Sequence, residues 1–161
     1  MSDAGEDFAQ LYDRVSGSLY RYALMILASR EQAEDVVQEV FATMMRRGVK
    51  NLNSVDGYLR TAVRNACYSA LRLRRNGVPI AESLLEAIPG GQSAADERVM
   101  LEQALRSLPA DQREVVHLKI YEGWSFQEIA ATTGESVNTV ASRYRYGIDK
   151  LRTALGERRI G

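Results

Sequence analysis

The sequence predicts an all-α protein with two small helical domains joined by a flexible linker. Apolar residues recur at helical spacing along most of the 161 residues, and no alternating pattern of useful length indicates a strand. The helical pattern fails once, between residues 76 and 95, where two prolines, two adjacent glycines and several acidic residues gather. We therefore expect one domain over residues 1–76, a linker over 77–95 and a second domain over 96–161.

Three long helices are expected in the first domain. The inward stripe of the first helix contains Phe8, Leu11, Tyr12, Val15, Leu19, Tyr22, Ala23 and Ile26. The stripe of the second helix contains Ala33, Val36, Val37, Val40, Phe41 and Met44. The third helix is expected from about residue 54 to 75, either continuous or broken in two, and its inward residues are Val55, Tyr58, Leu59, Ala62, Val63, Ala66, Ala70 and Leu71.

The linker contains an isolated apolar patch, which could form a short helix of its own. The patch consists of Leu84, Leu85 and Ile88. At about 20 residues the linker spans roughly 25 Å on average and at most about 65 Å, so the two domains could sit on separate stretches of a partner.

Four further helices are expected in the second domain. The first should bury Val99, Leu101 and Leu105, and the next, which begins near Pro109, should bury Val115, Val116, Leu118 and Ile120. Ser125 and Glu128 form a capping box that opens a short helix ending at Gly134. Ser136 can cap the last helix, in which Gly147 marks either a kink or a close contact.

Residues 126–145 predict a helix-turn-helix. Ala130 is small where two helices would cross, Gly134 suits a positive φ in the turn, and Val140 packs the second helix on the first. A plain helical hairpin is the alternative interpretation. In a helix-turn-helix, the polar side chains directed toward solvent or DNA would be Ser136, Asn138, Thr139, Ser142, Arg143 and Arg145.

Charge is distributed in alternating blocks although the formal net charge is zero. Residues 46–78 carry eight basic side chains and one acidic one, and residues 113–161 carry eight basic and six acidic ones. The blocks before each of them are acidic. This pattern fits two separate nucleic-acid-binding patches, and equally fits ordinary solvated faces.

Several function classes lack support in the sequence. A single cysteine, Cys67, and a single histidine, His117, cannot form an internal disulfide or a zinc site of the usual type. No phosphate-binding loop, dinucleotide fingerprint or nucleophile elbow occurs. There is no membrane-spanning run and no signal peptide. We therefore expect a cytoplasmic protein that is no enzyme and uses no cofactor, metal ion or small-molecule substrate.

Five segments resemble the extracytoplasmic-function (ECF) sigma factors, the small two-domain group IV of the sigma-70 family of bacterial RNA polymerase. Ala33-Glu-Asp-Val-Val-Gln-Glu-Val-Phe41 and Tyr58-Leu-Arg-Thr-Ala-Val-Arg-Asn65 resemble region 2 of that family. Segments 105–116, 123–130 and 138–144 resemble its region 4. The C-terminal pattern alone is shared with other helix-turn-helix regulators, whereas the acidic helix followed by the Arg-Asn segment is far more selective.

The resemblance implies a sigma factor that binds core polymerase and directs promoter recognition and initiation. It assigns binding of the polymerase, through the β′ clamp helices with contacts to the β subunit, to Asp35, Gln38, Glu39 and Phe41. It assigns opening and holding of the minus-10 element to Arg60, Arg64, Asn65, Tyr68, Arg72, Arg74 and Arg75. It assigns the minus-35 element to the polar helix-turn-helix residues named above. An anti-sigma factor is a further partner that the family implies.

The sequence departs from the family pattern at three places. Ser69 stands where aspartate is frequent in the family, Ala141 stands where lysine is frequent, and residues 146–149 stand where a more basic run is usual. The last helix is therefore less cationic than is usual, which lowers the expected affinity for free DNA. A stand-alone helix-turn-helix regulator, with a sensing or dimerising N-terminal half, remains the alternative function. A dimer that binds a palindromic duplex tightly without polymerase would favour that alternative.

Overall fold

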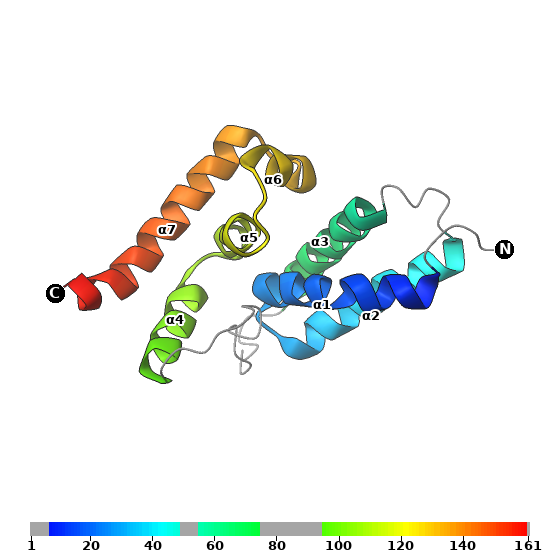
Figure 1. Cartoon of the computed structure of the whole chain (residues 1–161), viewed down its shortest axis with the longest axis horizontal. Helices are drawn as coiled ribbons and strands as arrows, with labels where there is room; N and C mark the ends of the chain where they lie inside the picture. The colour runs from blue at the N-terminus through cyan, green and yellow to red at the C-terminus, as the bar shows by residue number, and fades with distance from the viewer. Residues whose placement is uncertain (1–6, 49–54, 75–94, 161) are drawn as a thin grey trace.

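The structure is a computed structural model that describes residues 7–48, 55–74 and 95–160. All regular secondary structure in these ranges is helical, which confirms the predicted all-α class (Figure 1). In the N-terminal half, α1 (Phe8–Leu27) and α2 (Arg30–Arg47) form a hairpin against which α3 (Val55–Leu73) packs. The third helix is therefore continuous over its described length. The predicted linker, with its apolar patch, lies almost entirely outside the described residues.

The C-terminal half contains the four predicted helices and one irregular turn. Helix α4 (Ala95–Ser107) is followed by α5 (Ala110–Val116), which continues directly into a π-helical turn, η3 (His117–Tyr121). Helices α6 (Phe126–Thr133) and α7 (Val137–Ile160) complete the half. In Figure 1, α5 lies between the N-terminal helices on one side and α4 and α7 on the other, and α6 lies above α5.

Side-chain caps fix where the helices of the N-terminal half begin. Asp7 and Gln10 form a reciprocal capping box at the start of α1, and Ser29 caps α2 by accepting a hydrogen bond from the backbone N–H of Gln32. Ala28, between the two helices, adopts a left-handed conformation with φ of 54°, and its N–H donates to the Leu24 carbonyl. The result is a tight hairpin between α1 and α2.

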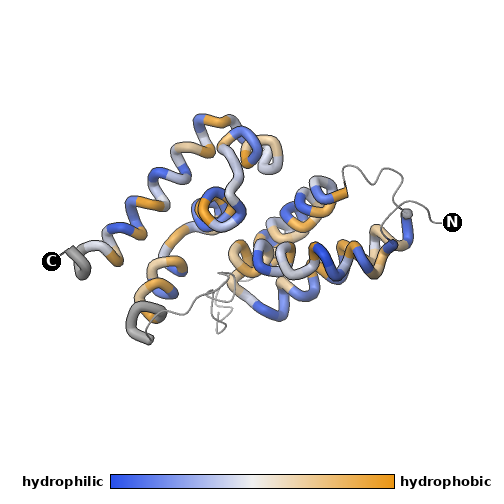
Figure 2. The backbone as a smooth tube through the Cα atoms, in the orientation of Figure 1, coloured by the Kyte–Doolittle hydropathy of each residue, from blue (hydrophilic) through white to orange (hydrophobic). Residues whose placement is uncertain are grey.

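The core of the N-terminal half follows the predicted apolar stripes, which Figure 2 shows as alternating hydrophobic and hydrophilic stretches along the helices. Tyr22 and Leu59 are fully buried there. Tyr58 was expected among the inward residues but is 47% exposed. The burial stripe of α3 runs through Val55, Leu59 and Val63, and Tyr58 lies one residue to the side of it.

Two predicted core residues of the C-terminal half are also exposed. Val99 is 55% exposed, because the buried side of α4 is formed by Ala104 and Leu105. Ile120 is 47% exposed and lies in the π-helical turn η3. A π-helical turn contains more residues than an α-helical one, so the spacing that places Leu118 inward no longer applies to Ile120.

The helix-turn-helix forms as predicted. Ser125 and Glu128 cap α6 reciprocally, Gly134 adopts φ of 76° in the turn, and Ser136 accepts a hydrogen bond from the Thr139 backbone N–H at 3.0 Å. Val140 is fully buried between the helices. Gly147 marks a close contact, because a Cβ atom there would lie 2.9 Å from Cγ2 of Val116.

The two halves pack directly against each other. Helix α1 contacts α5 and η3, and α3 contacts α6. Arg113 of α5 is buried at this junction and donates hydrogen bonds to the carbonyls of Met25 at 2.7 Å and Ile26 at 2.9 Å. Burial lowers the pKa of Arg113 to about 10, so the side chain is still charged at neutral pH. The sequence predicts two domains that could sit apart, and it gives no indication that the two halves pack against each other.

The thiol of Cys67 gives a first test of the packing. Cys67 is fully buried on α3, and burial together with the charge of Glu114 raises the pKa of its thiol to about 12. At about pH 8 the native thiol should therefore be ionised in roughly one molecule in ten thousand. We expect iodoacetamide to modify Cys67 only after unfolding in urea, as followed by mass spectrometry. Equal rates in the native and unfolded chain would contradict this packing.

Candidate nucleic-acid interface

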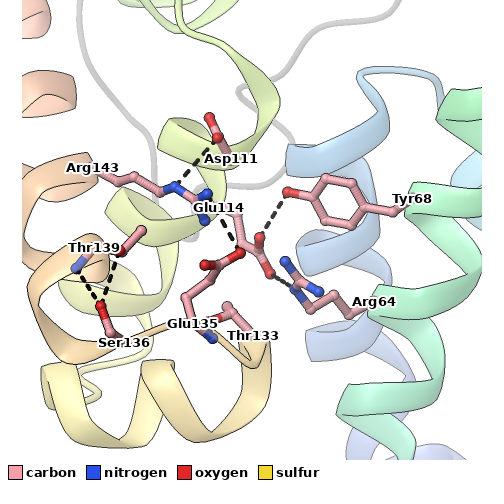
Figure 3. Close-up of polar contacts among 9 residues, drawn as sticks. All are labelled: Arg64, Tyr68, Asp111, Glu114, Thr133, Glu135, Ser136, Thr139 and Arg143. Carbon is pink, nitrogen blue, oxygen red and sulfur yellow. Dashed lines mark hydrogen bonds and ion pairs between the residues drawn. The ribbon is translucent and has the colours of Figure 1, made fainter.

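Three of the predicted minus-10 residues on α3, Arg60, Arg64 and Tyr68, point toward the C-terminal half. Arg64 donates from Nε to Oε2 of Glu114 at 2.7 Å, and the Tyr68 hydroxyl donates to Oε1 of the same carboxylate at 2.7 Å (Figure 3). The hydroxyl of Tyr22, on α1, also donates to Glu114. Glu114 is fully buried, so three donors from the N-terminal half satisfy a carboxylate that water does not reach.

The electrostatics of this cluster keep Arg64 and the two tyrosines in the protonated forms that donate hydrogen bonds. Burial raises the pKa of Tyr22 and Tyr68 above the ordinary range, and the Glu114 carboxylate raises both further, so both hydroxyls stay protonated donors. Although burial opposes its charge, the same carboxylate raises the pKa of Arg64. The guanidinium of Arg64 also lies 4.5 Å from the centre of the Tyr68 ring.

Arg60 makes a second pairing between the halves. It donates from Nη2 to Oε1 of Glu122 at 3.1 Å and to Oγ of Ser18 at 3.2 Å. Its guanidinium also lies over the rings of Tyr22 and Trp124. Although burial works against the charge of Glu122, the nearby His117 imidazole, whose Nε2 lies 3.4 Å from Oε2 of Glu122, and the charge of Arg60 lower the pKa of this carboxyl. Glu122 therefore stays ionised at neutral pH.

The remaining predicted minus-10 residues divide into two groups. Asn65 and Arg72 are exposed on the same helix, and Arg72 donates to Oγ of Ser69. Arg74 instead donates to the carbonyl of Leu27 at 2.8 Å and to the side chain of Gln32, so it joins α3 to the α1–α2 turn. In this structure Arg74 acts as a cap rather than as a free basic side chain. Arg75 lies outside the described residues.

The predicted minus-35 residues on α7 also divide by exposure. Ser136, Asn138 and Arg145 are exposed, whereas Thr139 and Ser142 are half-buried. Arg143 does not point freely into solvent. Its guanidinium pairs with Asp111 at 3.3 Å and with Glu135 at 3.5 Å, and Figure 3 shows it opposite Arg64 and Tyr68, with Glu114 and Glu135 between them.

A cleft of about 390 Å³ separates the two predicted DNA-binding helices. One wall is formed by α3, and the other by Asp111, Glu135 and Arg143. The basic and aromatic side chains of α3 therefore face acidic side chains of the same chain. In this arrangement Arg60, Arg64 and Tyr68 already hold carboxylates, and a nucleic-acid strand would have to displace those carboxylates to reach them.

The predicted polymerase-binding residues lie on α2, away from this cleft. Asp35, Gln38 and Glu39 are exposed, and Glu39 pairs with Arg46 about two helical turns further along. Phe41 does not share this face. It is 2% exposed, and its ring packs edge-on against the rings of Phe8 and Tyr12. Phe41 is therefore a core residue that packs α2 onto α1, not part of the exposed face.

Sequence reasoning missed the residues that join the halves, Arg113, Glu114 and Glu122. In the sequence, Arg113 and Glu114 are charged neighbours in an amphipathic helix, which is typical of a solvated face. Their partners in the N-terminal half lie 46 or more positions away, and only the tertiary structure brings them together. The one available signal was the apolar Val115-Val116 that follows, which places the pair close to the core.

The described residues contain no group of three or more histidine, cysteine or acidic side chains placed to hold a metal ion. None of the helices that the structure describes has the length and apolarity required to cross a membrane.

Comparison with known families and proteins gives consistent matches. Residues 11–77 match Sigma-70 region 2, and residues 98–151 match Sigma-70 region 4. The ECF RNA polymerase sigma factor SigL of Mycobacterium tuberculosis is 31% identical over 160 residues, covering 91% of this chain and 88% of the relative. The RNA polymerase sigma factor CarQ of Myxococcus xanthus is 36% identical over 162 residues, covering 96% of this chain and 91% of the relative.

A solved structure matches across both halves. It is the co-crystal structure of the sigma factor RpoE in complex with the anti-sigma factor NepR from Bartonella quintana. The TM-score is 0.72 at 28% identity, with coverage of 94% of this chain and 98% of that chain.

Proposed function

Because the chain belongs to the extracytoplasmic-function sigma factors of bacterial RNA polymerase, we propose that its two helical halves bind polymerase and promoter DNA through separate surfaces. As a member of this family it binds core polymerase and directs sequence-specific initiation, and a stand-alone helix-turn-helix regulator is not favoured. We assign polymerase binding and the minus-10 element to residues 1–76, and the minus-35 element to residues 96–161, with 77–95 as the linker.

The polymerase-binding surface in this proposal is the exposed row Asp35, Gln38 and Glu39 on α2. These side chains recur within about one helical turn, so they present carboxylate and amide groups on one face. Directly beneath them, Val37, Val40 and Phe41 are buried and hold the helix in place. A basic partner such as the β′ clamp helices could pair with this row without rearrangement of the helix.

The minus-10 surface is the face of α3 that carries Arg60, Arg64, Asn65, Tyr68 and Arg72. Unpaired bases can stack on tyrosine and guanidinium planes, and arginine pairs with phosphate oxygens. The chemistry of this face supports the assignment, because Arg64 and Tyr68 together hold a carboxylate in the present structure. A phosphate diester offers the same kind of acceptor oxygens.

The minus-35 surface is the start of α7. Ser136, Asn138, Thr139 and Ser142 bring short polar groups to the first turns of a helix, where base edges and phosphates can be met together. Arg145 and, once released from its two carboxylates, Arg143 add the charged contacts. This helix begins as a recognition helix should, with a glycine turn and a serine cap.

We also propose an anti-sigma factor as a protein partner, since the matched sigma factor was crystallised with one. The proposal assigns the chain a binding role without a reaction of its own, in keeping with relatives that are named as sigma factors. Polymerase and chromosomal DNA as partners place this role in the cytoplasm.

The observation that carries the proposal is the exposed acidic row on α2 combined with a basic α3 and a helix-turn-helix in one chain. Retention of the chain on core polymerase, followed by sequencing of the promoter DNA that the complex selects, tests it. We expect selected DNA to share two short elements separated by a fixed spacing. Failure to bind polymerase, with any co-purified partner removed, would contradict the proposal.

Arg145→Ala should lower the affinity of the polymerase complex for its selected promoter by roughly 5- to 10-fold, because one exposed cation near the reading edge is lost. If Arg145 contacts a phosphate, the slope of the logarithm of the binding constant against the logarithm of the salt concentration should also fall in magnitude by about one. Lys150→Ala, an equal loss of charge on an exposed site further along α7, is the matched control. Equal losses in the two variants would remove Arg145 from the site.

A further inference from the structure

The contact between the halves uses side chains that the proposed function assigns to DNA. Arg60 and Arg64 of α3 pair with Glu122 and Glu114 of the C-terminal half, at 3.1 Å and 2.7 Å. All four side chains are largely or fully removed from solvent. The same α3 face cannot hold a DNA strand while it holds these two carboxylates.

Glu114 is the centre of this contact. Its carboxylate accepts from Tyr22, Arg64 and Tyr68, all of which belong to the N-terminal half. A carboxylate that accepts from an arginine and from tyrosine hydroxyls uses the same donors that could bind the oxygens of a phosphate. Figure 3 shows Glu114 projecting from the C-terminal half toward Arg64 and Tyr68 of α3.

The helix-turn-helix is constrained on the same side. Arg143 pairs with Asp111 and Glu135, and all three line the cleft opposite Arg64 and Tyr68. Asp111 is only three residues before Glu114 on α5. One short helix therefore supplies carboxylates to basic side chains of both proposed DNA-binding surfaces.

We propose that Glu114 is an internal latch that holds the free chain in a closed, DNA-incompetent state, by occupying with its own carboxylate the α3 side chains that would bind the minus-10 strand. This inference rests on the proposed function of α3. Opening exposes Glu114 and Arg64 to water, and neither residue belongs to the proposed polymerase-binding row on α2. The apparent DNA affinity of the free chain is then reduced by the fraction of molecules that are open.

Neutralising the latch should open the chain. Glu114→Gln keeps the size of the side chain but leaves Arg64 buried without a counter-charge in the closed state, whereas both groups are solvated in the open state. We expect the open fraction, and with it the affinity of the free chain for single-stranded oligodeoxythymidine, to rise on the order of 10-fold. Tyr22→Phe removes one donor and keeps the ring, so it should produce a smaller shift in the same direction.

The experiment measures the distance between the halves in the full chain without polymerase. Spin labels on cysteines introduced by Asp13→Cys on α1 and Thr153→Cys on α7, both exposed, report the separation by pulsed electron paramagnetic resonance in a Cys67→Ala background. Binding of oligodeoxythymidine is followed by fluorescence anisotropy. Asp149→Asn, an equal loss of charge at an exposed site of the same half, is the matched control.

The expected result is a single short distance in the unaltered and Asp149→Asn chains, longer distances in Glu114→Gln, and tighter DNA binding in that variant alone. If Glu114→Gln fails to fold, the shift in Tyr22→Phe decides in its place. Distances and DNA affinity that stay unchanged in the folded variants would overturn the latch. Because neither readout uses polymerase, a chain that opens as expected yet never binds core polymerase would instead contradict the proposed function.

Discussion

Reversing two charges on α2, Asp35→Lys with Glu39→Lys, is expected to abolish retention of the chain on core polymerase, with a loss of at least about 100-fold in affinity. The exposed row would then present two cations to a basic partner, and like charges brought together at an interface cost several kcal/mol. The fold should survive, since both side chains are exposed and the Glu39–Arg46 pair is a surface pair worth about 1 kcal/mol or less.

Asp13→Lys is the control for this prediction. Asp13 is an exposed acidic residue of the same half but lies on α1. Its substitution by lysine therefore reverses one surface charge and leaves the α2 row unchanged. Binding to immobilised core polymerase is measured for both variants, with circular dichroism to check folding. If the double reversal binds as well as Asp13→Lys, the α2 row is not the polymerase-binding surface.

Gly147→Leu is expected to destabilise the C-terminal half by about 1–3 kcal/mol, the usual cost of forcing extra atoms into a packed contact. A Cβ atom at Gly147 would lie 2.9 Å from Cγ2 of Val116 and 3.6 Å from Cβ of Gln112. Val116 is a short, buried side chain that cannot move aside, so α7 has to shift away from α5. Relief of the glycine penalty, at most about 1 kcal/mol in a helix interior, offsets only part of this cost.

Gly156→Leu makes the same substitution in the same helix at an open site, where the nearest atom to a new Cβ is Cγ of Arg152 at 3.8 Å. Urea unfolding followed by circular dichroism should show Gly156→Leu as stable as the unaltered chain or slightly more stable. If Gly147→Leu unfolds at the same urea concentration as Gly156→Leu, the close contact between α5 and α7 at Gly147 is contradicted.

Most of the helices could be predicted from the sequence because their signals are local. The capping box at Ser125 and Glu128, the positive φ at Gly134 and the burial of Val140 all depend on residues within one or two helical turns. The same is true of the stripes of α1 and α2. Only the exposure of Tyr58, Val99 and Ile120 went against these patterns, since helical spacing cannot resolve the edge of a buried stripe or anticipate a π-helical turn.

The candidate site was less predictable because its geometry is not local. Spacing placed Arg64 and Tyr68 on a basic helix, but nothing near them in the sequence indicates that a glutamate 46 to 50 positions away occupies both. Glu114 is buried only because two separate halves meet around it. Phe41 and Arg74 show the same limit, since matching a family motif does not distinguish a side chain that supports a surface from one that forms it.

The most direct test of this account is the distance between labels at positions 13 and 153, measured before and after addition of core polymerase and promoter DNA. The account predicts a short distance in the free chain and a longer one in the complex, because α3 and α7 must leave the carboxylates of α5 to reach the minus-10 and minus-35 elements. A chain that binds polymerase and promoter DNA while keeping the short distance would contradict it.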